Sequence, residues 1–252
     1  MSALKVLIVG ETWITTSTHT KGFDSFITSS YGEGYSYLKT ALEDGGAEVT
    51  VITNERAPID FPDTVEKLAA YDVLVLSDIG ANTLLLTPDT WKLARVAPNR
   101  LEVIRDYVMQ GGGLVMVGGY LTFTGIDAKG FWKDTPVEPC LPVRLMATDD
   151  RSEQPQGISG TTVKADHPIL AGVPEGWPAV LGYNRTTLAE GAELIATIGA
   201  DHPFIAAADC GKGRSVVFTS DCSPHWCPEP FLAWEGYPVL WRNICAFAAG
   251  RS

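Results

Sequence analysis

The stretch Ser-Asp-Cys-Ser-Pro-His-Trp-Cys, residues 220–227, holds the densest group of side chains that could do chemistry. A histidine with an ordinary pKa of about 6.5 can transfer protons near neutral pH, and a neighbouring carboxylate can orient its ring. We therefore interpret His225 as a candidate acid or base and Asp221 as the residue that orients it. The alternative is that Asp221 caps a turn and His225 makes a structural hydrogen bond.

The same stretch also contains possible metal ligands. Cys222, His225 and Cys227 have the spacing Cys-x-x-His-x-Cys, which offers three ligands for zinc. A structural zinc site needs a fourth ligand, usually in paired Cys-x-x-Cys or His-x-x-x-His elements. His19 or His167 could supply that ligand only through a tertiary contact. We therefore predict no metal site and no cofactor.

A second candidate site follows the apolar run at residues 114–117, where the chain continues as Gly118-Gly119-Tyr120. In many hydrolytic and amide-transfer enzymes, a strand that enters a sharp turn carries the nucleophile. This turn has neither serine nor cysteine at its apex. Tyr120, or the backbone amides of residues 118–120 including Gly118 and Gly119, could instead polarise a bound substrate.

A long polar segment, Glu-Thr-Trp-Ile-Thr-Thr-Ser-Thr-His-Thr-Lys-Gly-Phe-Asp, follows the first apolar run as residues 11–24. We interpret it as a loop, and loops of more than ~12 residues are often functional. Glu11, Trp13, His19 and Lys21 would then line a ligand pocket. The alternative is a surface loop that packs on a neighbouring subunit.

Asp78 and Asn82 follow the apolar run at residues 72–78. Side chains at these positions would point into the same crevice and could bind a ligand. The alternative is structural, because aspartate and asparagine also form side-chain-to-backbone hydrogen bonds in turns.

These segments belong to a rhythm of strands and helices that predicts an α/β fold, with a doubly wound, mostly parallel sheet and helices on both faces. Ligands of such sheets bind beyond the carboxyl ends of the strands. The predicted strands cover residues 4–10, 47–53, 72–78 and 114–117, and the helical patterns cover 35–46, 64–71 and 99–113. A C-terminal β-hairpin at 203–221 and a closing helix at 237–250 complete a single domain, residues 1–252. Residues 121–190 decorate the sheet with short strands and loops.

Four motifs carry a family resemblance that covers nearly the whole chain. They are VLIVGETW (6–13), DVLVLSDIGANTLLL (72–86), YVMQGGGLVMVGGY (107–120) and GKGRSVVFTSDCSPHW (211–226). The chain resembles the class I glutamine-amidotransferase-like proteins and is distantly similar to trehalose-utilisation-type proteins. The resemblance implies a flavodoxin-like sheet. It also implies a catalytic cysteine at the position of Gly119 or Tyr120, with acid and base groups near Asp221 and His225. Because the cysteine is absent there, we predict no glutaminase activity.

Composition limits the partners of the chain. The 252 residues carry a net charge of −11, which disfavours nucleic acids and anionic membrane surfaces as partners. No apolar run approaches the ~18 residues of a spanning helix, and no signal core follows the N-terminus. Five scattered cysteines are typical of reduced thiols in the cytoplasm.

Two functions remain open from the sequence. The first is binding of a small polar metabolite in the crevice, and the second is acid/base chemistry by His225 and Asp221 on a polar, sugar-like substrate. We also predict a homo-oligomer, because large aromatic residues gather on irregular segments. They are Trp13, Phe23, Phe26, Phe131, Trp132, Trp226, Phe231, Trp234 and Tyr237.

Overall fold

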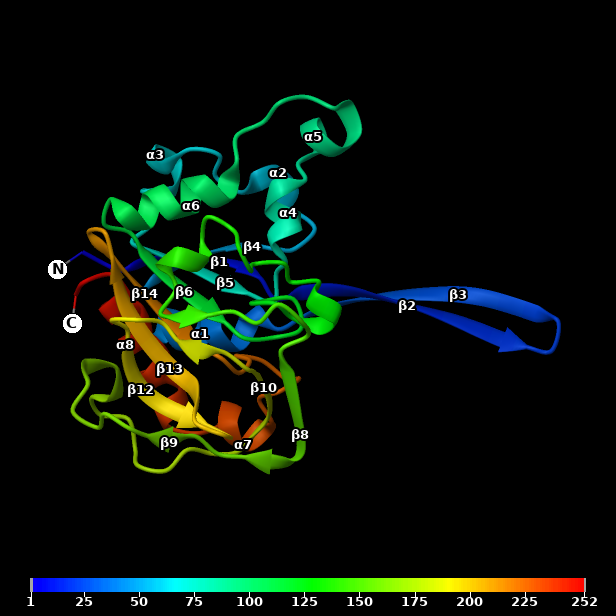
Figure 1. The fold of residues 1–252 in the computed structure, drawn as a ribbon. Helices are drawn as coiled ribbons and strands as arrows, with labels where there is room; N and C mark the ends of the chain where they lie inside the picture. The colour runs from blue at the N-terminus through cyan, green and yellow to red at the C-terminus, as the bar shows by residue number, and fades with distance from the viewer. Residues whose placement is uncertain (1, 252) are drawn as a thin grey trace.

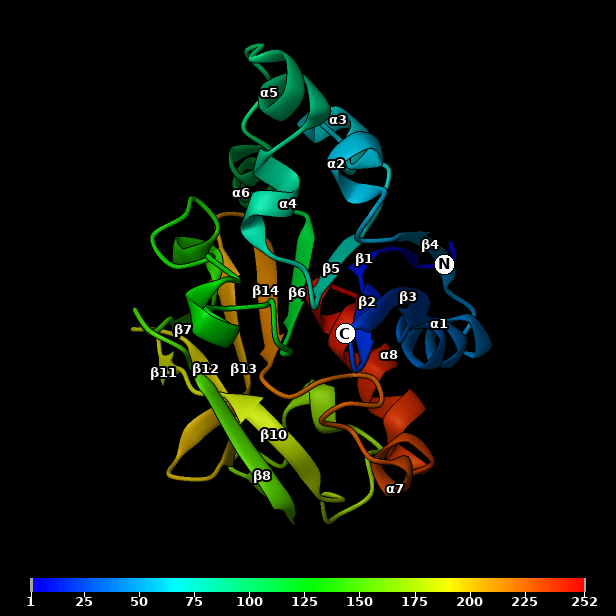
Figure 2. The same cartoon turned by 90° about the vertical axis from the view of Figure 1, so that its right-hand side faces the viewer.

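The computed structural model describes residues 2–251 and is built on an eight-stranded sheet of order β4-β1-β5-β6-β14-β13-β12-β9 (Figures 1 and 2). The first five strands are parallel: β4 (Glu48–Ile52), β1 (Lys5–Gly10), β5 (Val73–Ser77), β6 (Gly113–Val117) and β14 (Gly213–Phe218). The last three are antiparallel: β13 (His202–Cys210), β12 (Glu193–Ile198) and β9 (Thr161–Thr162). The predicted flavodoxin-like sheet and its C-terminal hairpin are thus confirmed.

Helices cover both faces of this sheet. On one face α1 (Tyr35–Asp44) and α8 (Gly236–Ala248) pack against the buried side chains of the parallel strands. On the other face α6 (Arg100–Met109) does the same with several one-turn helices. The strands are apolar on both sides because both sides are covered, which is why they were recognisable in the sequence.

The strands that follow β1 in the chain lie on both sides of it in the sheet: β4 lies on one side, and β5, β6 and β14 lie on the other. Such a switch point leaves a crevice beyond the carboxyl ends of the strands. Glu11 follows β1 and Asp78 follows β5, so the topology alone places both residues at this crevice.

The remaining elements are short. The one-turn helices are α2 (Ala57–Asp60), α3 (Val65–Leu68), α4 (Ala81–Leu85), α5 (Pro88–Leu93) and α7 (Glu229–Leu232), with 3-10 turns η1 (Ile126–Ala128), η2 (Glu138–Cys140) and η3 (Pro168–Leu170). Two small sheets pair β10 (Val180–Asn184) with β8 (Arg151–Ile158) and β11 (Thr187–Leu188) with β7 (Val143–Arg144). Within residues 2–251, no helix is both long and apolar enough to cross a membrane.

The segment at residues 11–24, predicted as a loop, instead forms much of a long β-hairpin, so the loop prediction is wrong. Strands β2 (Thr12–Lys21) and β3 (Asp24–Glu33) pair in register along their whole length. Gly22 adopts a φ of +63° in the two-residue turn, a conformation that glycine adopts without strain. This hairpin, which we call the arm, projects away from the body of the molecule (Figure 1).

The aromatic argument for an oligomer also needs correction. Four of the residues that motivated it are buried in the protein itself: Trp132, Trp226, Phe231 and Tyr237. They pack the segments and helices around the sheet onto it and are therefore core residues. Trp13, Phe23 and Phe26, all on the arm, and Phe131 remain exposed.

Candidate functional site

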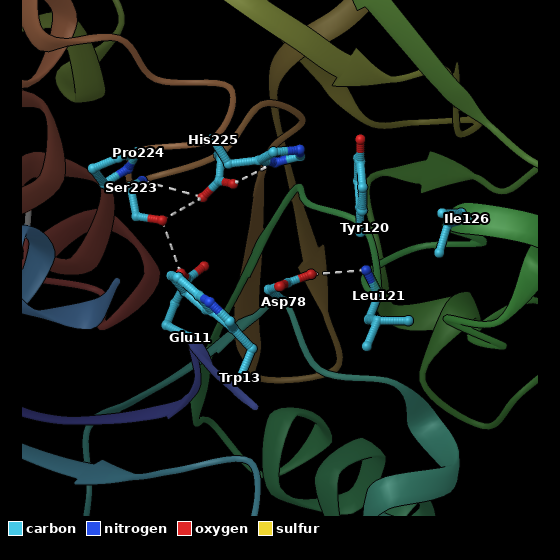
Figure 3. Close-up of a pocket in the computed structure, with 10 residues that line it drawn as sticks. Glu11, Trp13, Asp78, Tyr120, Leu121, Ile126, Ser223, Pro224 and His225 are labelled. Carbon is cyan, nitrogen blue, oxygen red and sulfur yellow. Dashed lines mark hydrogen bonds and ion pairs between the residues drawn. The ribbon is translucent and has the colours of Figure 1, made fainter. Parts of the chain in front are cut away.

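A cavity of about 470 Å³ lies at the carboxyl ends of β1, β5 and β6, beside the segment that follows β14 (Figure 3). Six of the predicted site residues line this cavity, and it lies at the switch point that the strand order indicates. The lining residues are Glu11, Trp13, Asp78, Tyr120, Leu121, Ile126, Asp221, Ser223, Pro224 and His225.

His225 and Asp221 form a hydrogen-bonded pair at this cavity. Nδ1 of His225 lies 3.2 Å from Oδ2 of Asp221. The other carboxylate oxygen of Asp221 accepts the backbone amides of Cys222 and Ser223 at 2.7 and 3.1 Å. Asp221 therefore caps the turn and orients the imidazole at once, so the two interpretations made from the sequence are not exclusive.

The imidazole of His225 lies at the cavity wall and can bind a proton there. Burial alone would lower the pKa of His225, but the hydrogen bond and charge of Asp221, with the charge of Asp78, raise it above the ordinary value. The side chain remains 35% exposed, so a ligand in the cavity can reach it. Because Nδ1 is held by Asp221, Nε2 is the nitrogen that can exchange a proton with a ligand.

Glu11 is a buried carboxyl at the base of the cavity. Its backbone has a φ of +55°, and its side chain accepts the hydroxyl proton of Ser77 at 2.5 Å. It also accepts the hydroxyl proton of Ser223 at 3.0 Å (Figure 3). Burial, followed by the charges of Asp221 and Asp78, raises its pKa well above the usual range. Strained backbone of this kind persists only where the surroundings hold it, and it is common at functional sites.

Asp78 is the third carboxyl and has a φ of +43°. Its Oδ1 accepts the Leu121 amide at 2.8 Å, which ties the end of β5 to the segment after β6. Burial and then the charge of Asp221 raise the pKa of Asp78 to about 6. Glu11, Asp78 and Asp221 thus share one weakly solvated space, where ionising all three is unfavourable.

Aromatic side chains form the walls of the cavity. The Tyr120 ring meets the His225 ring edge-on, with centroids 4.1 Å apart, and the Arg151 guanidinium lies 4.8 Å from the Tyr120 centroid on another side. Trp13 reaches the cavity from the root of the arm. Tyr120 therefore presents a ring to the cavity and to His225 (Figure 3).

The glycine turn after β6 is held by residues that the sequence did not single out. The Gly119 amide donates to Oδ1 of Asn184 at 2.9 Å, and the Asn184 side chain donates to the carbonyl of Gly119 and to Asp150. Neither Gly118 nor Gly119 lines the cavity. Since the Gly119 amide is used inside the protein, it is not placed to polarise a ligand.

A side chain at position 119 would be strained. Gly119 has a φ of +149°, and a Cβ atom there would lie 3.0 Å from Oδ1 of Asp78. At Gly118 a Cβ atom would lie 2.3 Å from the Thr219 carbonyl oxygen. The turn is therefore built for glycine at both positions.

Besides Gly118 and Gly119, three predicted ligand-binding residues, His19, Lys21 and Asn82, lie outside the cavity lining. His19 bonds to Thr28 at 2.9 Å and stacks on Phe26 within the arm, and Lys21 lies next to the arm turn. Asn82 is exposed on α4. The long polar segment forms a hairpin whose tip lies far from the cavity. His19 and Lys21 lie near that tip, and so they do not line the cavity as predicted.

The structure does not bring the zinc ligands suggested by the sequence together. Across residues 2–251, the one cluster of three potential ligand atoms within 4.8 Å of one another is Glu11, Asp221 and Cys222, all buried. The Cys227 thiol donates instead to the Asp221 carbonyl at 2.6 Å. Burial raises the pKa of both Cys222 and Cys227, so the thiolates that bind zinc are disfavoured.

Comparison with known proteins places the chain among relatives of similar length. A family model described as "Putative glutamine amidotransferase" matches residues 5–249. The cytoplasmic protein STM3548 from Salmonella typhimurium is 41% identical, with a TM-score of 0.94 over 97% of this chain and 99% of the relative. The cytoplasmic protein STM1381 from Salmonella typhimurium LT2 is 42% identical, with the same TM-score and coverage.

A more distant likeness concerns the fold alone. A ThuA-like protein from Parabacteroides merdae is 15% identical, with a TM-score of 0.57 over 98% of this chain and 90% of the other. No protein among those with curated descriptions matches the chain.

Proposed function

Because the chain belongs to the putative glutamine amidotransferase family, we propose that it binds a small polar metabolite in the crevice at the strand ends and does not hydrolyse glutamine. The observation that carries this proposal is the glycine turn after β6. A class I amidotransferase needs a cysteine there, as the family resemblance implies. Gly119 combines a φ of +149° with a Cβ position 3.0 Å from Oδ1 of Asp78, so a cysteine there would be strained, and the other position that the resemblance indicates is occupied by Tyr120.

The other cysteines offer no replacement nucleophile at the cavity. Cys222 is the nearest, with Sγ 3.7 Å from Oε1 of Glu11, but it is fully buried. Burial and the charges of Glu11 and Asp221 raise the pKa of its thiol well above the ordinary value. Covalent attack requires a thiolate, so these contacts support the absence of a glutamyl-thioester step.

The cavity walls favour a particular ligand chemistry. Asp78 and Asp221 can accept hydrogen bonds from hydroxyl or amino groups, and their negative charge disfavours an anionic ligand. Tyr120 and Trp13 add flat apolar surface of the kind that packs against a sugar-like ring. We therefore propose an uncharged or cationic polar metabolite. We also propose that the protein is cytoplasmic, as the descriptions of the two Salmonella relatives support.

A second candidate function is supported by the His225–Asp221 pair. An imidazole oriented by a carboxylate, beside an Asp78 whose pKa is about 6, has the composition of an acid/base site. In this alternative His225 exchanges the proton through Nε2, Asp221 orients it, and Tyr120 contributes its ring or its hydroxyl. The substrate class would be the same.

The test begins with the protein purified gently from cells and examined by native mass spectrometry for a bound small molecule. We expect a released ligand that is uncharged or cationic, and no ammonia from glutamine above a no-enzyme blank. Sustained ammonia release abolished by Cys222→Ala would overturn the proposal.

His225→Gln then separates the two functions. If the protein only binds, His225→Gln changes the affinity for the ligand and no product appears with either form. If it is an enzyme, the wild type converts the ligand and His225→Gln still binds it but loses turnover. Glu102→Gln on α6, outside the cavity lining, is the control and should change neither.

A further inference from the structure

The arm exposes apolar side chains along its whole length. Phe23 at the turn is fully exposed, and Ile27 near the middle is 67% exposed. The other exposed apolar side chains of the arm are Trp13, Ile14, Phe26 and Tyr31. Six such residues on one protruding ribbon are unusual on a free surface and typical of an interaction site.

The arm also lacks the support that a hairpin of this length needs. Among residues 2–251 its two strands hydrogen-bond as a sheet of their own, separate from the eight-stranded sheet. An isolated two-stranded hairpin is marginally stable in water, and its outer edges present backbone groups for pairing. The arm therefore fits a role in which another surface covers it.

Charge indicates what that surface is. Residues 14–18 and 27–31, the middle of the arm, contain no charged side chain, although the chain carries a net charge of −11. On one face the cross-strand pairs are Ile14 with Tyr31, Thr16 with Ser29 and Thr18 with Ile27. This face is apolar or hydroxylated and self-complementary, so two copies can meet on it without like-charge contact.

We propose that the arm packs antiparallel against the arm of a second copy of this chain, so that each tip lies beside the root of the partner's arm. A two-fold axis across the arms brings the uncharged middle sections together. It also holds the two acidic bodies apart by about the ~33 Å that a ten-residue strand spans. That separation exceeds the Debye length of ~8 Å at physiological salt, so repulsion between the bodies is screened.

The register determines which side chains the pairing brings together. Ile14, Thr16 and Thr18 lie on the pairing face, and Trp13, His19 and Lys21 lie on the opposite face, which the pairing leaves uncovered. A tip that reaches the partner's root therefore brings the Phe23 turn beside the root of the partner's arm.

The pairing face carries Ile14, Ile27 and Tyr31, and the turn adds Phe23. A buried aromatic side chain accounts for ~150–250 Å². Two reciprocal arms therefore offer eight large apolar side chains, with an area on the order of the ~1,200 Å² at the lower end of specific interfaces.

Light scattering at 0.15 M salt tests the pairing. The wild type should have twice the 27.1 kDa mass of the chain, and the triple variant Ile14→Ser, Phe23→Ser, Ile27→Ser should have 27.1 kDa with an unchanged circular dichroism spectrum. The control is Trp91→Ser, Leu93→Ser, Val96→Ser, which removes equally exposed apolar residues from another protrusion and should remain dimeric. A monomeric wild type, or a dimer lost only in the control, would overturn the proposal.

Cross-linking tests the antiparallel arrangement. A chain with Phe23→Cys at the tip and Glu33→Cys at the root cannot close a disulfide on itself, because the arm separates the two positions by ~30 Å. We expect oxidation to link two copies covalently in this variant. The chain with Phe23→Cys alone should stay unlinked. If that single variant links as readily, the tips meet each other and the proposed arrangement is wrong.

Discussion

Nδ1 of His225 lies 3.2 Å from Oδ2 of Asp221, while Oδ1 of the same carboxylate accepts two backbone amides from the turn that carries the histidine. The turn and the pair therefore hold each other in place. Asp221 cannot rotate away from His225 without leaving buried amides unpaired, which is costly. The orientation of the imidazole is thus built into the fold before any ligand arrives.

This relationship predicts the outcome of Asp221→Asn. The amide oxygen can still accept the turn amides, but the negative charge beside His225 is lost, so the pKa of His225 should fall. Titration of the imidazole nitrogens by NMR measures it. His202, whose pKa burial and Arg185 lower, is the internal control and should not move.

The same change should alter stability in a defined pH window. The raised pKa of His225 stabilises the fold below the unfolded pKa of about 6.5. This stabilisation is lost as the pH rises through the folded pKa. The deficit of Asp221→Asn in denaturant unfolding should therefore shrink as the pH is raised. An unchanged His225 pKa in the variant would contradict the electrostatic role of Asp221.

The glycine turn predicts that a cysteine introduced at position 119 destabilises the fold. Gly119→Cys places a side chain at a φ of +149° and against Asp78, so we expect a loss of roughly 1–3 kcal/mol or more in the free energy of unfolding. Gly46→Ala is the matched control, because Gly46 also has a positive φ but open space around it. Its loss should be smaller, and urea unfolding of both measures the difference. Equal losses would mean that the contact with Asp78 is unimportant.

The fold was predictable because its strands are buried on both faces. The apolar runs that became β1, β5 and β6 cannot be placed anywhere but inside a covered sheet, and their polar ends then fall at the crevice. This reasoning found Glu11, Asp78 and Tyr120, since each directly follows a strand or its glycine turn.

The arm was missed because its strands are exposed on both faces and lack apolar alternation. A signal was present in the density of β-branched threonines, at Thr12, Thr15, Thr16, Thr18 and Thr20, which favour strands. Ser77 and Ser223 could not be singled out either. Their role depends on contacts with Glu11, from which Ser77 is separated by 66 positions in the sequence and Ser223 by 212.

Asp78→Asn should make the protein more stable at neutral pH. A carboxyl whose pKa rises on folding to about 6 binds its proton more tightly in the folded state. Stability therefore falls as the pH rises from about 4 to about 6 and stays lower above that range. The variant removes this loss, and its amide oxygen can still accept the Leu121 amide.

The expected gain at pH 7 is about 1–3 kcal/mol, since one pKa unit corresponds to ~1.4 kcal/mol. Urea unfolding at pH 4 and pH 7 measures it. Asp209→Asn, at an exposed position outside the cavity, is the control and should show no such gain. A variant less stable than the wild type at pH 7 would show that Asp78 makes favourable interactions as an anion.

The neighbouring aromatics Phe131 and Trp132 predict opposite results for one kind of change. Trp132 is fully buried, and its indole nitrogen donates to the Ile79 carbonyl at 2.9 Å, directly after Asp78. Trp132→Phe leaves that carbonyl unpaired and a void beside it, so the free energy of unfolding should fall by roughly 1–3 kcal/mol. Phe131 is 55% exposed with a φ of +58°, a conformation that asparagine tolerates better than phenylalanine. Phe131→Asn should therefore preserve or slightly raise stability. Both variants should keep the mass of the wild type in light scattering, because we expect the arm, and not this segment, to join two copies. If Trp132→Phe were folded but monomeric, residues 131 and 132 would have to contribute to the dimer interface.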